Sequence, residues 1–345
     1  MPFYKDLDPS DKNDERTIER LRILRNALKA QIPERTLKET LLLATWNIRD
    51  FDKPAYGWRM EEAFYYIAEI ISFFDIVAIQ EVYKDLTALK RVKYLLGSNW
   101  KFVFSDTTEG ARGNGERIAY LFDKRKIKFG GLAGELVIPP IKTLDGEWIS
   151  PDQIWRTPLI CGFQAGWSRF MVASVHVLFG KGGANSPERI NEIRQIAEFL
   201  KKRSEDETAW ARKLFLLGDF NIFSKKDNTY KVLEENGFVC PEPLKEAYTN
   251  VKQNKQYDQI LLRERKHSLE ILKGGTFNFF DYVFKGEDEN LYKPFMKKKN
   301  SEEIYKSYDQ WRTHQMSDHM PLWVEARIDY SDEYLENKLE KSMQH

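Results

Sequence analysis

The sequence predicts an α/β sandwich, with β-sheets inside and helices outside. Helical and strand patterns alternate in both halves of the 345-residue chain, while residues 101–176 are mostly strand-like runs separated by glycine and proline. The sequence has no repeat at a fixed period and no Gly/Pro/Ser-rich linker that would divide it. Hydrophobic residues make up 42% of the chain, which is enough for a sizeable core and excludes a disordered protein.

Five helices are predicted, three of them from apolar side chains at the three- and four-residue spacing of one helical face, at residues 14–32, 59–74 and 187–203, and two shorter ones that Gly97 and Gly237 close. The first, residues 14–32, ends before Pro33, and it either packs on the domain or binds a partner. Its apolar face consists of Ile18, Leu21, Leu24, Leu28 and Ile32. The other four helices are predicted at residues 59–74, 85–96, 187–203 and 228–236. Ser186 and Pro187 suit the N-cap and the first turn of the fourth helix.

Apolar runs predict ten strands between these helices. They lie at residues 41–47, 76–81, 102–104, 118–122, 132–138, 159–163, 170–177, 214–219, 258–263 and 322–328. Residues 281–316 form a long charged and aromatic stretch, which we interpret as an elaborated loop. We expect a helical extension at residues 1–35, one domain at residues 36–330 and a polar tail at residues 331–345.

Bulk charge and cysteine content limit the function classes. Lys and Arg number 54 against 53 Asp and Glu, giving a net charge of +1, which argues against a protein held on nucleic acid by overall charge. A local basic groove that binds nucleic acid is still possible. Cys161 and Cys240 are too few for a disulfide scaffold, so two free buried thiols are expected, with one disulfide as the alternative. Without a recognisable signal peptide or an apolar run of about 20 residues, we expect a soluble cytoplasmic protein.

Six segments place carboxylates, amides or imidazoles beside an apolar strand-like run, where such groups are costly unless they are paired or bind a cation. Four follow or end a strand, namely Trp46-Asn47, Gln80-Glu81, Ser174-Val175-His176 and Gly218-Asp219-Phe220-Asn221. Two precede a strand, namely Tyr257-Asp258-Gln259 and Ser317-Asp318-His319. We therefore expect one site, gathered at one rim of the sheets.

Each segment alone has an ordinary explanation. The segment 219–221 matches an Asp-x-Asn turn, and Asn47 or Asp258 could cap a turn or strand. His176 could be a core imidazole with a satisfied hydrogen bond, and His319 a surface histidine. The remaining histidines, His267, His314 and His345, are expected to be solvated.

The functional interpretation uses the same residue types together. Asp219 would orient or deprotonate a water molecule, and Asn221 would donate hydrogen bonds to a phosphoryl oxygen. Glu81 is a hard carboxylate ligand of the kind that Mg²⁺ takes. A histidine flanked by an aspartate, as His319 is, can move a proton near neutral pH.

Several other chemistries are excluded by missing motifs. No Cys/His spacing matches a zinc site. The sequence has neither the Gly-x-x-x-x-Gly-Lys-Ser/Thr loop nor a Gly-x-Gly-x-x-Gly turn after a strand. It also lacks the Gly-x-Ser-x-Gly elbow of serine hydrolases.

Taken in order, the six segments resemble the endonuclease/exonuclease/phosphatase superfamily, which includes pancreatic-type deoxyribonuclease and the apurinic endonucleases. A seventh segment, Glu116-Arg117-Ile118-Ala119-Tyr120-Leu121-Phe122, is similar to the deoxyribonuclease segment in which an arginine before a strand meets phosphate. The resemblance spans about residues 40–328. It implies a four-layer sandwich of two mixed β-sheets flanked by helices.

The resemblance also implies metal-assisted attack of water on a phosphorus ester, without a covalent enzyme intermediate. Mg²⁺, for which Mn²⁺ can substitute, would be bound by Glu81, with Asp318 near the metal. Asp258 would hold His319 against the scissile phosphate, and Asp219 would orient the water. The remaining implied roles are phosphate binding by Asn47, Asn221 and Arg117, and assistance to the leaving group or developing charge by His176.

We therefore expect a Mg²⁺-dependent nuclease acting on DNA or RNA, with lysines 297–299 on the backbone and Trp58, Trp155 and Trp311 stacking on bases. A phosphatase acting on a small phosphoester or a phosphoinositide is the alternative, and a catalytically dead binding module is a third. The chain lacks the disulfide support of secreted deoxyribonucleases, and the Tyr-containing segment of apurinic endonucleases is not evident near residues 110–120. Repulsion among the clustered carboxylates predicts that a divalent cation raises the melting temperature.

Overall fold

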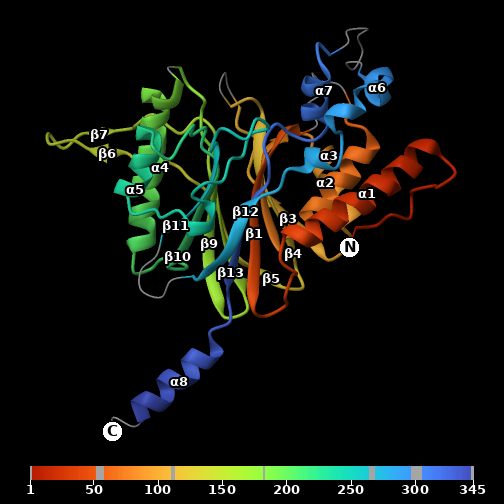
Figure 1. The fold of residues 1–345 in the computed structure, drawn as a ribbon. Helices are drawn as coiled ribbons and strands as arrows, with labels where there is room; N and C mark the ends of the chain where they lie inside the picture. Colours follow the sequence, from red (N-terminus) through yellow and green to blue (C-terminus); the bar gives the residue numbers. More distant parts are fainter. Residues whose placement is uncertain are drawn as a thin grey trace.

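Two mixed β-sheets lie face to face between two layers of helices in the computed structural model of the chain (Figure 1). The structure describes residues 2–51, 58–109, 113–181, 183–263, 269–296 and 305–342. This arrangement confirms the predicted fold class, a four-layer sandwich.

Sheet A has six strands in the order β12-β13-β1-β2-β4-β3. Only its β1–β2 pair is parallel among the strand pairs of the described residues in this sheet. The strands are β1 Thr40–Phe51, β2 Ile76–Tyr83, β3 Trp100–Phe104, β4 Glu116–Asp123, β12 Ile271–Thr276 and β13 Leu322–Arg327.

Sheet B has five strands in the order β11-β10-β9-β8-β5, and β9 and β10 form its parallel pair. The strands are β5 Ile127–Glu135, β8 Leu159–Ala165, β9 Ser168–His176, β10 Lys213–Asp219 and β11 Asp258–Arg263. A separate two-stranded hairpin, β6 Ile141–Lys142 with β7 Trp148–Ile149, projects from the body beyond α4 (Figure 1).

Helices α1–α3 cover the outer face of sheet A, and α4 and α5 cover that of sheet B (Figure 1). The helices are α1 Lys12–Gln31, α2 Glu61–Ile71, α3 Thr87–Leu96, α4 Pro187–Glu205, α5 Asn228–Glu235, α6 Glu289–Tyr292, α7 Tyr308–Gln315 and α8 Ser331–Ser342. All five predicted helices and all ten predicted strands are present, with shifted ends.

The alternation of side chains along β1 explains how the layers pack. Leu41 and Leu43 point into the core between the two sheets, while Leu42 and Ala44 point into the core beneath the helices. Successive strand residues face opposite sides of a sheet, so a strand buried on both faces is apolar throughout. This accounts for the continuous apolar run that begins at residue 41.

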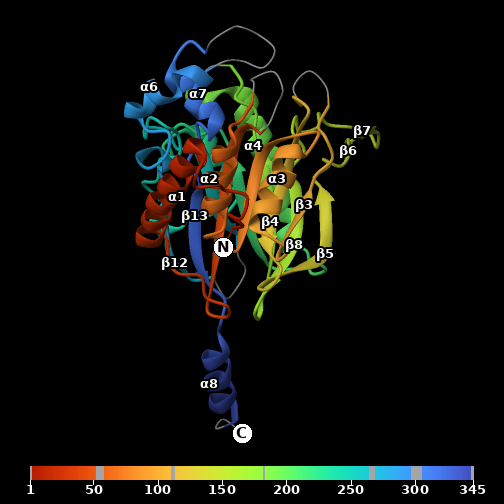
Figure 2. The same cartoon turned by 90° about the vertical axis from the view of Figure 1, so that its right-hand side faces the viewer.

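The ends of the chain differ in how they pack. Leu21, Leu24 and Leu28 of α1 belong to the core beneath the helices, so the leading helix packs on the domain. Residues 331–342, expected as a polar tail, form α8, which extends away from the rest of the chain in both views (Figure 1, Figure 2). None of the helices built from the described residues is long and apolar enough to cross a membrane.

Several local expectations need correction or qualification. The stretch 281–316 is not simply a loop, because α6 and α7 form within its described part. Ser186 is the N-cap residue of α4, but its hydroxyl donates to Glu188 and makes no capping bond to the helix backbone. Cys161 and Cys240 are both free and buried, as predicted.

Candidate functional site

Two parallel strand pairs bring the predicted site residues to one edge of the sandwich. The carboxyl ends of β1 and β2 lie together in sheet A, and those of β9 and β10 lie together in sheet B. Strands β13 and β11 run antiparallel to β1 and β10, so they begin at this edge. Asp219 is consequently the register partner of both His176 and Asp258.

Gly218 permits this register. Its φ of 127° is one that side-chain-bearing residues rarely adopt, and a β-carbon there would lie 2.1 Å from the carbonyl oxygen of Val175 on β9. The glycine before Asp219 therefore lets β10 pair closely with β9 at the point where both strands deliver their polar residues.

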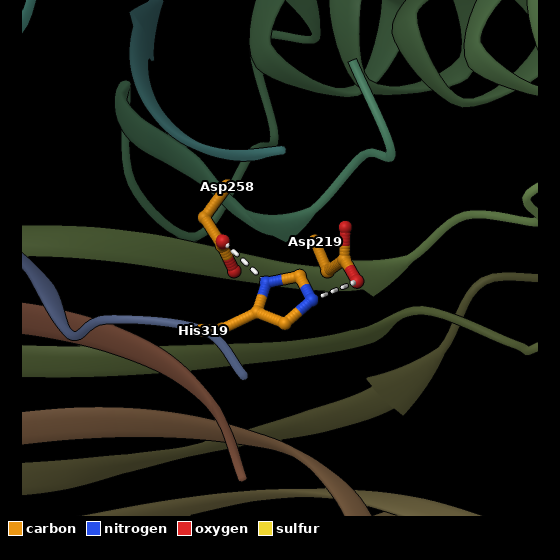
Figure 3. Close-up of side chains that lie close together, drawn as sticks. All are labelled: Asp219, Asp258 and His319. Atoms are coloured by element: carbon orange, nitrogen blue, oxygen red, sulfur yellow. Dashed lines mark hydrogen bonds and ion pairs between the residues drawn. The ribbon is translucent and has the colours of Figure 1, made fainter. Parts of the chain in front are cut away.

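Asp219, Asp258 and His319 form a buried cluster at this edge (Figure 3). The Nδ1 of His319 donates to Oδ2 of Asp258 across 2.7 Å, and its Nε2 lies 3.7 Å from Oδ2 of Asp219. Burial lowers the pKa of His319, but the Asp258 and Asp219 carboxylates outweigh burial and raise that pKa well above its usual value. The imidazole is therefore held as a cation between two carboxylates.

The segment before β13 is tied to β1, which fixes the position of His319. The hydroxyl of Ser317 donates to the carbonyl of Asn47 and accepts from the backbone N–H of His319. The indole of Trp46 donates to the carbonyl of His319 across 2.9 Å. Residues some 270 positions apart in the chain thus share one edge.

Glu81 and Asn47 supply the sheet A side of the site. The Nδ2 of Asn47 donates to Oε1 of Glu81 at 2.9 Å and to Oδ2 of Asp219 at 3.0 Å, so it joins the two sheets. Burial raises the pKa of Glu81 to about 7, helped by Glu116 and Asp50 and opposed by His176. Glu81 also has a positive φ of 60°, a strained backbone conformation of the kind that occurs at functional sites.

A second imidazole, that of His176, faces Asp219 from the neighbouring strand β9. The Nε2 of His176 lies 3.7 Å from Oδ2 of Asp219, and its Nδ1 lies 3.0 Å from Oε2 of Glu116. Burial and Arg156 lower the pKa of His176, but Glu116 and Asp219 outweigh them and raise it. Both histidines therefore have a carboxylate on Nδ1 and turn Nε2 toward the same oxygen.

Glu116 was quoted within the arginine segment but was not predicted to be a site residue. Burial alone would raise its pKa, but His176 and Arg156 outweigh burial and lower the pKa to about 2. The Nε of Arg156 lies 3.0 Å from Oε2 of Glu116. Glu116 begins β4 after a turn, and only the pairing of β4 with β2 beside Glu81 reveals its place.

Asn221 follows Asp219 in a tight turn that a buried arginine secures. Its backbone N–H donates to Oδ1 of Asp219 at 2.8 Å, its Nδ2 donates to the carbonyl of Val177, and its φ is 53°. The guanidinium of Arg189, fully buried, donates to the carbonyls of Asn221 and Gly183. The sequence analysis predicted Asn221 but gave no signal for Arg189.

A polar bridge lies beneath the site, between the two sheets. The Nε2 of Gln80 donates to the hydroxyls of Ser174 on β9 and Thr45 on β1, at 2.9 and 3.0 Å. All three side chains are fully buried. Satisfied buried hydrogen bonds of this kind favour one relative placement of the sheets, and thereby of the residues above them.

Arg117 and Asp318 lie beside the cluster rather than within it. The guanidinium of Arg117 donates to the carbonyl of Ser105 and the carboxylate of Asp106, and it lines a narrow pocket with Glu81 and His176. Asp318 precedes His319 and helps to raise its pKa. Among the described residues, Asp219, Asp258 and His319 have ligand atoms within 4.8 Å of one another, and this group includes neither Glu81 nor Asp318.

Two sequence-based expectations about aromatic and histidine residues are wrong. Trp311 cannot stack on a base, because it is 1% exposed and packs against Tyr292 with ring centroids 5.2 Å apart. His314 is not solvated but 1% exposed within α7. Trp58 is 65% exposed and Trp155 half-buried, so both stay candidates. Lysines 297–299 together with His267 and His345 lie outside the described residues.

The residues present fit a hard divalent cation at Glu81, Asn47 and Asp219. These side chains offer oxygen ligands of the type that Mg²⁺ prefers. The Oδ1 of Asn47 is buried and accepts no hydrogen bond within the part of the chain that the structure describes, so a cation would satisfy it. A cation there would also stabilise the charged form of Glu81. His319 is disfavoured as a ligand because a protonated imidazole has no free lone pair.

Comparisons with known proteins support the resemblance. No protein-family model matches the chain. A curated protein of Thioalkalivibrio sp. (strain K90mix) named Deoxyribonuclease is 27% identical over 188 residues. The match covers 53% of this chain and 46% of that protein, so it spans less than half of the relative's length.

Solved structures match the chain over most of its length. An endonuclease/exonuclease/phosphatase family protein from Bacteroides thetaiotaomicron superimposes with a TM-score of 0.54 and 17% identity, covering 86% of this chain and 98% of that one. The chain has the endonuclease/exonuclease/phosphatase fold. The resemblance predicted from the ordered segments is confirmed at the level of the fold.

Other proteins with this fold differ in what they bind or act on. A mannosyl-6-phosphatase of Bacteroides thetaiotaomicron VPI-5482 matches with a TM-score of 0.53 and 18% identity, over 83% of this chain and 99% of that one. The D. rerio TDP2 structure complexed with a single-strand DNA product matches with a TM-score of 0.52 and 15% identity, over 83% and 98%. The fold therefore leaves the substrate to the residues around the site.

Proposed function

We propose that the chain is a Mg²⁺-dependent phosphodiesterase that hydrolyses DNA or RNA by activated water. One observation carries the proposal: the Nε2 atoms of His176 and His319 both lie 3.7 Å from the same oxygen of Asp219. Each imidazole has its Nδ1 beside another carboxylate, which keeps it protonated and oriented.

This arrangement suits hydrolysis of a phosphorus ester. The transition state gathers negative charge on the phosphoryl oxygens, and two fixed imidazolium groups stabilise that charge with little reorganisation. Asp219 orients the attacking water and accepts its proton as the new P–O bond forms, His319 contacts the phosphate, and His176 donates its proton to the leaving oxygen as the old P–O bond breaks. A bound divalent cation at Glu81 would supply Lewis-acid stabilisation of the same charge. Asp318, beside His319, would add negative charge near that cation.

Other side chains of the site would position the phosphate. Asn221 uses its Nδ2 for the carbonyl of Val177 and keeps a second amide hydrogen for a phosphoryl oxygen. Asn47 donates its two amide hydrogens to Glu81 and Asp219, so it would bind a phosphate oxygen from the sheet A side by exchanging one of these bonds. Arg117 and Arg156 line the narrow pocket beside His176 and provide positive charge there.

A nucleic acid substrate is supported by the curated relative named Deoxyribonuclease and by the TDP2 structure with a DNA product. A phosphatase acting on a small phosphoester or phosphoinositide is the second candidate, supported by the near-neutral net charge of +1 and the mannosyl-6-phosphatase of the same fold. A dead binding module is disfavoured because every expected catalytic position is filled.

A substrate panel tests the proposal. Plasmid DNA, single-stranded DNA, RNA, inositol phosphates and mannose 6-phosphate would each be incubated with Mg²⁺ and with EDTA. The same reactions would be repeated with Asp219→Asn, and Asp145→Asn, an exposed carboxylate in the turn of the β6–β7 hairpin, would serve as the control.

We expect Mg²⁺-dependent cleavage of a nucleic acid that Asp219→Asn abolishes and the control keeps. Turnover of only the small phosphoesters would replace the nuclease by the phosphatase. No turnover of any substrate, together with no metal uptake, would support a catalytically dead binding module instead.

A further inference from the structure

A cavity of about 280 Å³ opens beside the site, on the side of His176. Its lining includes Trp155, Arg156, Phe179, Lys181 and Glu188. Arg156 connects the cavity to the site, because its Nε lies 3.0 Å from the carboxylate oxygen of Glu116 that holds His176. A group bound in the cavity would therefore sit next to the reacting phosphate.

Phe179 ends a row of aromatic rings that begins at the site. The ring centroids are 5.7 Å apart from His319 to Tyr257, 5.5 Å from Tyr257 to Phe223 and 5.8 Å from Phe223 to Phe179. The buried guanidinium of Arg189 lies 5.3 Å from the centroids of both Phe179 and Phe223. Phe179 is thus held from beneath by a buried cation and still leaves 51% of its surface exposed.

Phe179 differs from other exposed apolar side chains because it lines the cavity beside the site and is fixed by its contacts with Arg189 and Phe223, so its ring offers a preformed surface to a ligand. The aromatic faces of Trp155 and Phe179 are suited to stacking on a flat heterocycle. Arg156 and Lys181 would attract the phosphates on either side of it, and Glu188 could accept a hydrogen bond from an amino group at its edge. The cavity volume is at the low end for ligand sites, which fits one ring system.

These features suit a nucleotide whose base is not stacked on neighbouring bases. Bases in a duplex are stacked and paired, so only an unpaired base can lie against a protein ring. The row of aromatic rings from His319 to Phe179 extends away from the site. This favours a nucleic acid strand that crosses the site over a small phosphoester that only fills it.

We propose that the cavity between Trp155 and Phe179 is a subsite for one unstacked nucleobase beside the scissile phosphate, which makes single strands or frayed strand ends the preferred substrate. The proposal rests on the proposed phosphodiesterase function and adds the substrate class. Phe179 and Trp155 set specificity in it, and neither touches the reacting atoms.

Binding and cleavage would both be measured with three variants. Phe179→Ala removes the ring, and Phe179→Leu keeps an apolar side chain over Arg189 if the alanine variant unfolds. Trp167→Ala is the matched control, because Trp167 is 65% exposed and lies in the turn before β9, at the opposite end of that strand from His176. Melting curves would establish that each variant is folded.

The probes are a labelled single-stranded oligodeoxynucleotide of adenine and cytosine, whose bases carry amino groups, the same strand in a duplex, and the same strand with abasic residues around the cleavage position. Fluorescence anisotropy in EDTA reports binding without cleavage, and Mg²⁺ reactions report kcat and KM. We expect both Phe179 variants to weaken single-strand binding by roughly tenfold, because stacking contributes strongly for each base. Trp167→Ala should bind like the wild type, and the abasic strand should bind the wild type as weakly as the intact strand binds Phe179→Ala.

Equal affinity of the wild type for intact and abasic strands, or no effect of either Phe179 variant, would overturn the subsite while leaving the phosphodiesterase in place. Faster cleavage of duplex than of single strands would overturn it as well. Hydrolysis of mannose 6-phosphate that depends on Phe179, without cleavage of any oligonucleotide, would assign the cavity to a sugar ring. That last result would refute the proposed nuclease function and this inference together.

Discussion

Protonation of His314 should destabilise the fold at mildly acidic pH. The imidazole lies in α7, is 1% exposed and packs against Tyr305 with ring centroids 6.1 Å apart. Burial, together with the nearby positive charges of Arg59 and Arg49, lowers the pKa of His314 from 6.5 to about 2. The folded state therefore keeps this side chain neutral.

The size of the effect follows from linkage. The unfolded chain binds a proton at His314 below pH 6.5 while the folded chain does not, so stability is full above 6.5 and falls as the pH drops below it. Between pH 7.5 and 5.0 the loss amounts to about 2 kcal/mol. His176 and His319 have raised pKa values and contribute with the opposite sign.

Urea unfolding of the wild type and of His314→Phe at pH 7.5 and 5.0 isolates this residue. Loss of the His314 packing changes the free energy of unfolding equally at both pH values. The quantity to compare is therefore the loss of unfolding free energy between pH 7.5 and 5.0 in each protein. We expect the wild type to lose about 2 kcal/mol more than the variant. Gln310→Ala, an exposed change on the same helix, should follow the wild type. Parallel losses in the wild type and His314→Phe would refute a buried neutral imidazole.

Gly218→Ala should cost about 3 kcal/mol or more in urea unfolding, since the new β-carbon meets the carbonyl of Val175 at 2.1 Å, and an unchanged midpoint would contradict the strand register. Tyr120→Phe should cost about 1–3 kcal/mol, because the single hydroxyl hydrogen of Tyr120 is shared between two backbone carbonyls of the facing sheet, and a neutral result would mean that this bridge contributes nothing. Mg²⁺ at ten times its dissociation constant should raise the melting temperature of the wild type by about 2 °C and that of Glu81→Gln much less. A flat curve for the wild type across the Mg²⁺ titration would count against the cation site.

The local pattern of the sequence predicted most of the fold. Apolar periodicity located the helices and strands, because both depend on which face of an element is buried. Strand β12 escaped detection because Gly274 and Gly275 interrupt its apolar character. Helix α8 was also missed, since its apolar side chains Leu335 and Leu339 are exposed and no buried stripe marks it.

The residues of the candidate site also fall into those that the sequence pattern could predict and those that it could not. Residues that end or precede apolar strands, such as Asp219 and Asp258, could be predicted because their chemistry contrasts with the run beside them. Glu116 and Arg189 could not, since one begins a strand after a turn and the other lies on a charged helix. Their roles depend on sheet pairing and helix packing between segments far apart in the sequence.

Burial of individual side chains in the stretch 281–316 was the least predictable property. Trp311 and His314 appear in a charged, aperiodic segment, which suggests solvent exposure. The packing of Trp311 against the rings of Tyr292, Phe284 and Tyr308 explains its burial. Clusters of aromatic rings contributed by several turns leave no periodic signal in the sequence.

The rate of oligonucleotide cleavage at saturating Mg²⁺ by His319→Ala, compared with the wild type, tests most directly whether the strand ends form one hydrolytic site. The imidazole is held by Asp258 at 2.7 Å and faces Asp219, so its removal should lower kcat by about a hundredfold or more while the protein still melts cooperatively. Cleavage by a folded His319→Ala protein at the rate of the wild type would show that the chemistry takes place elsewhere.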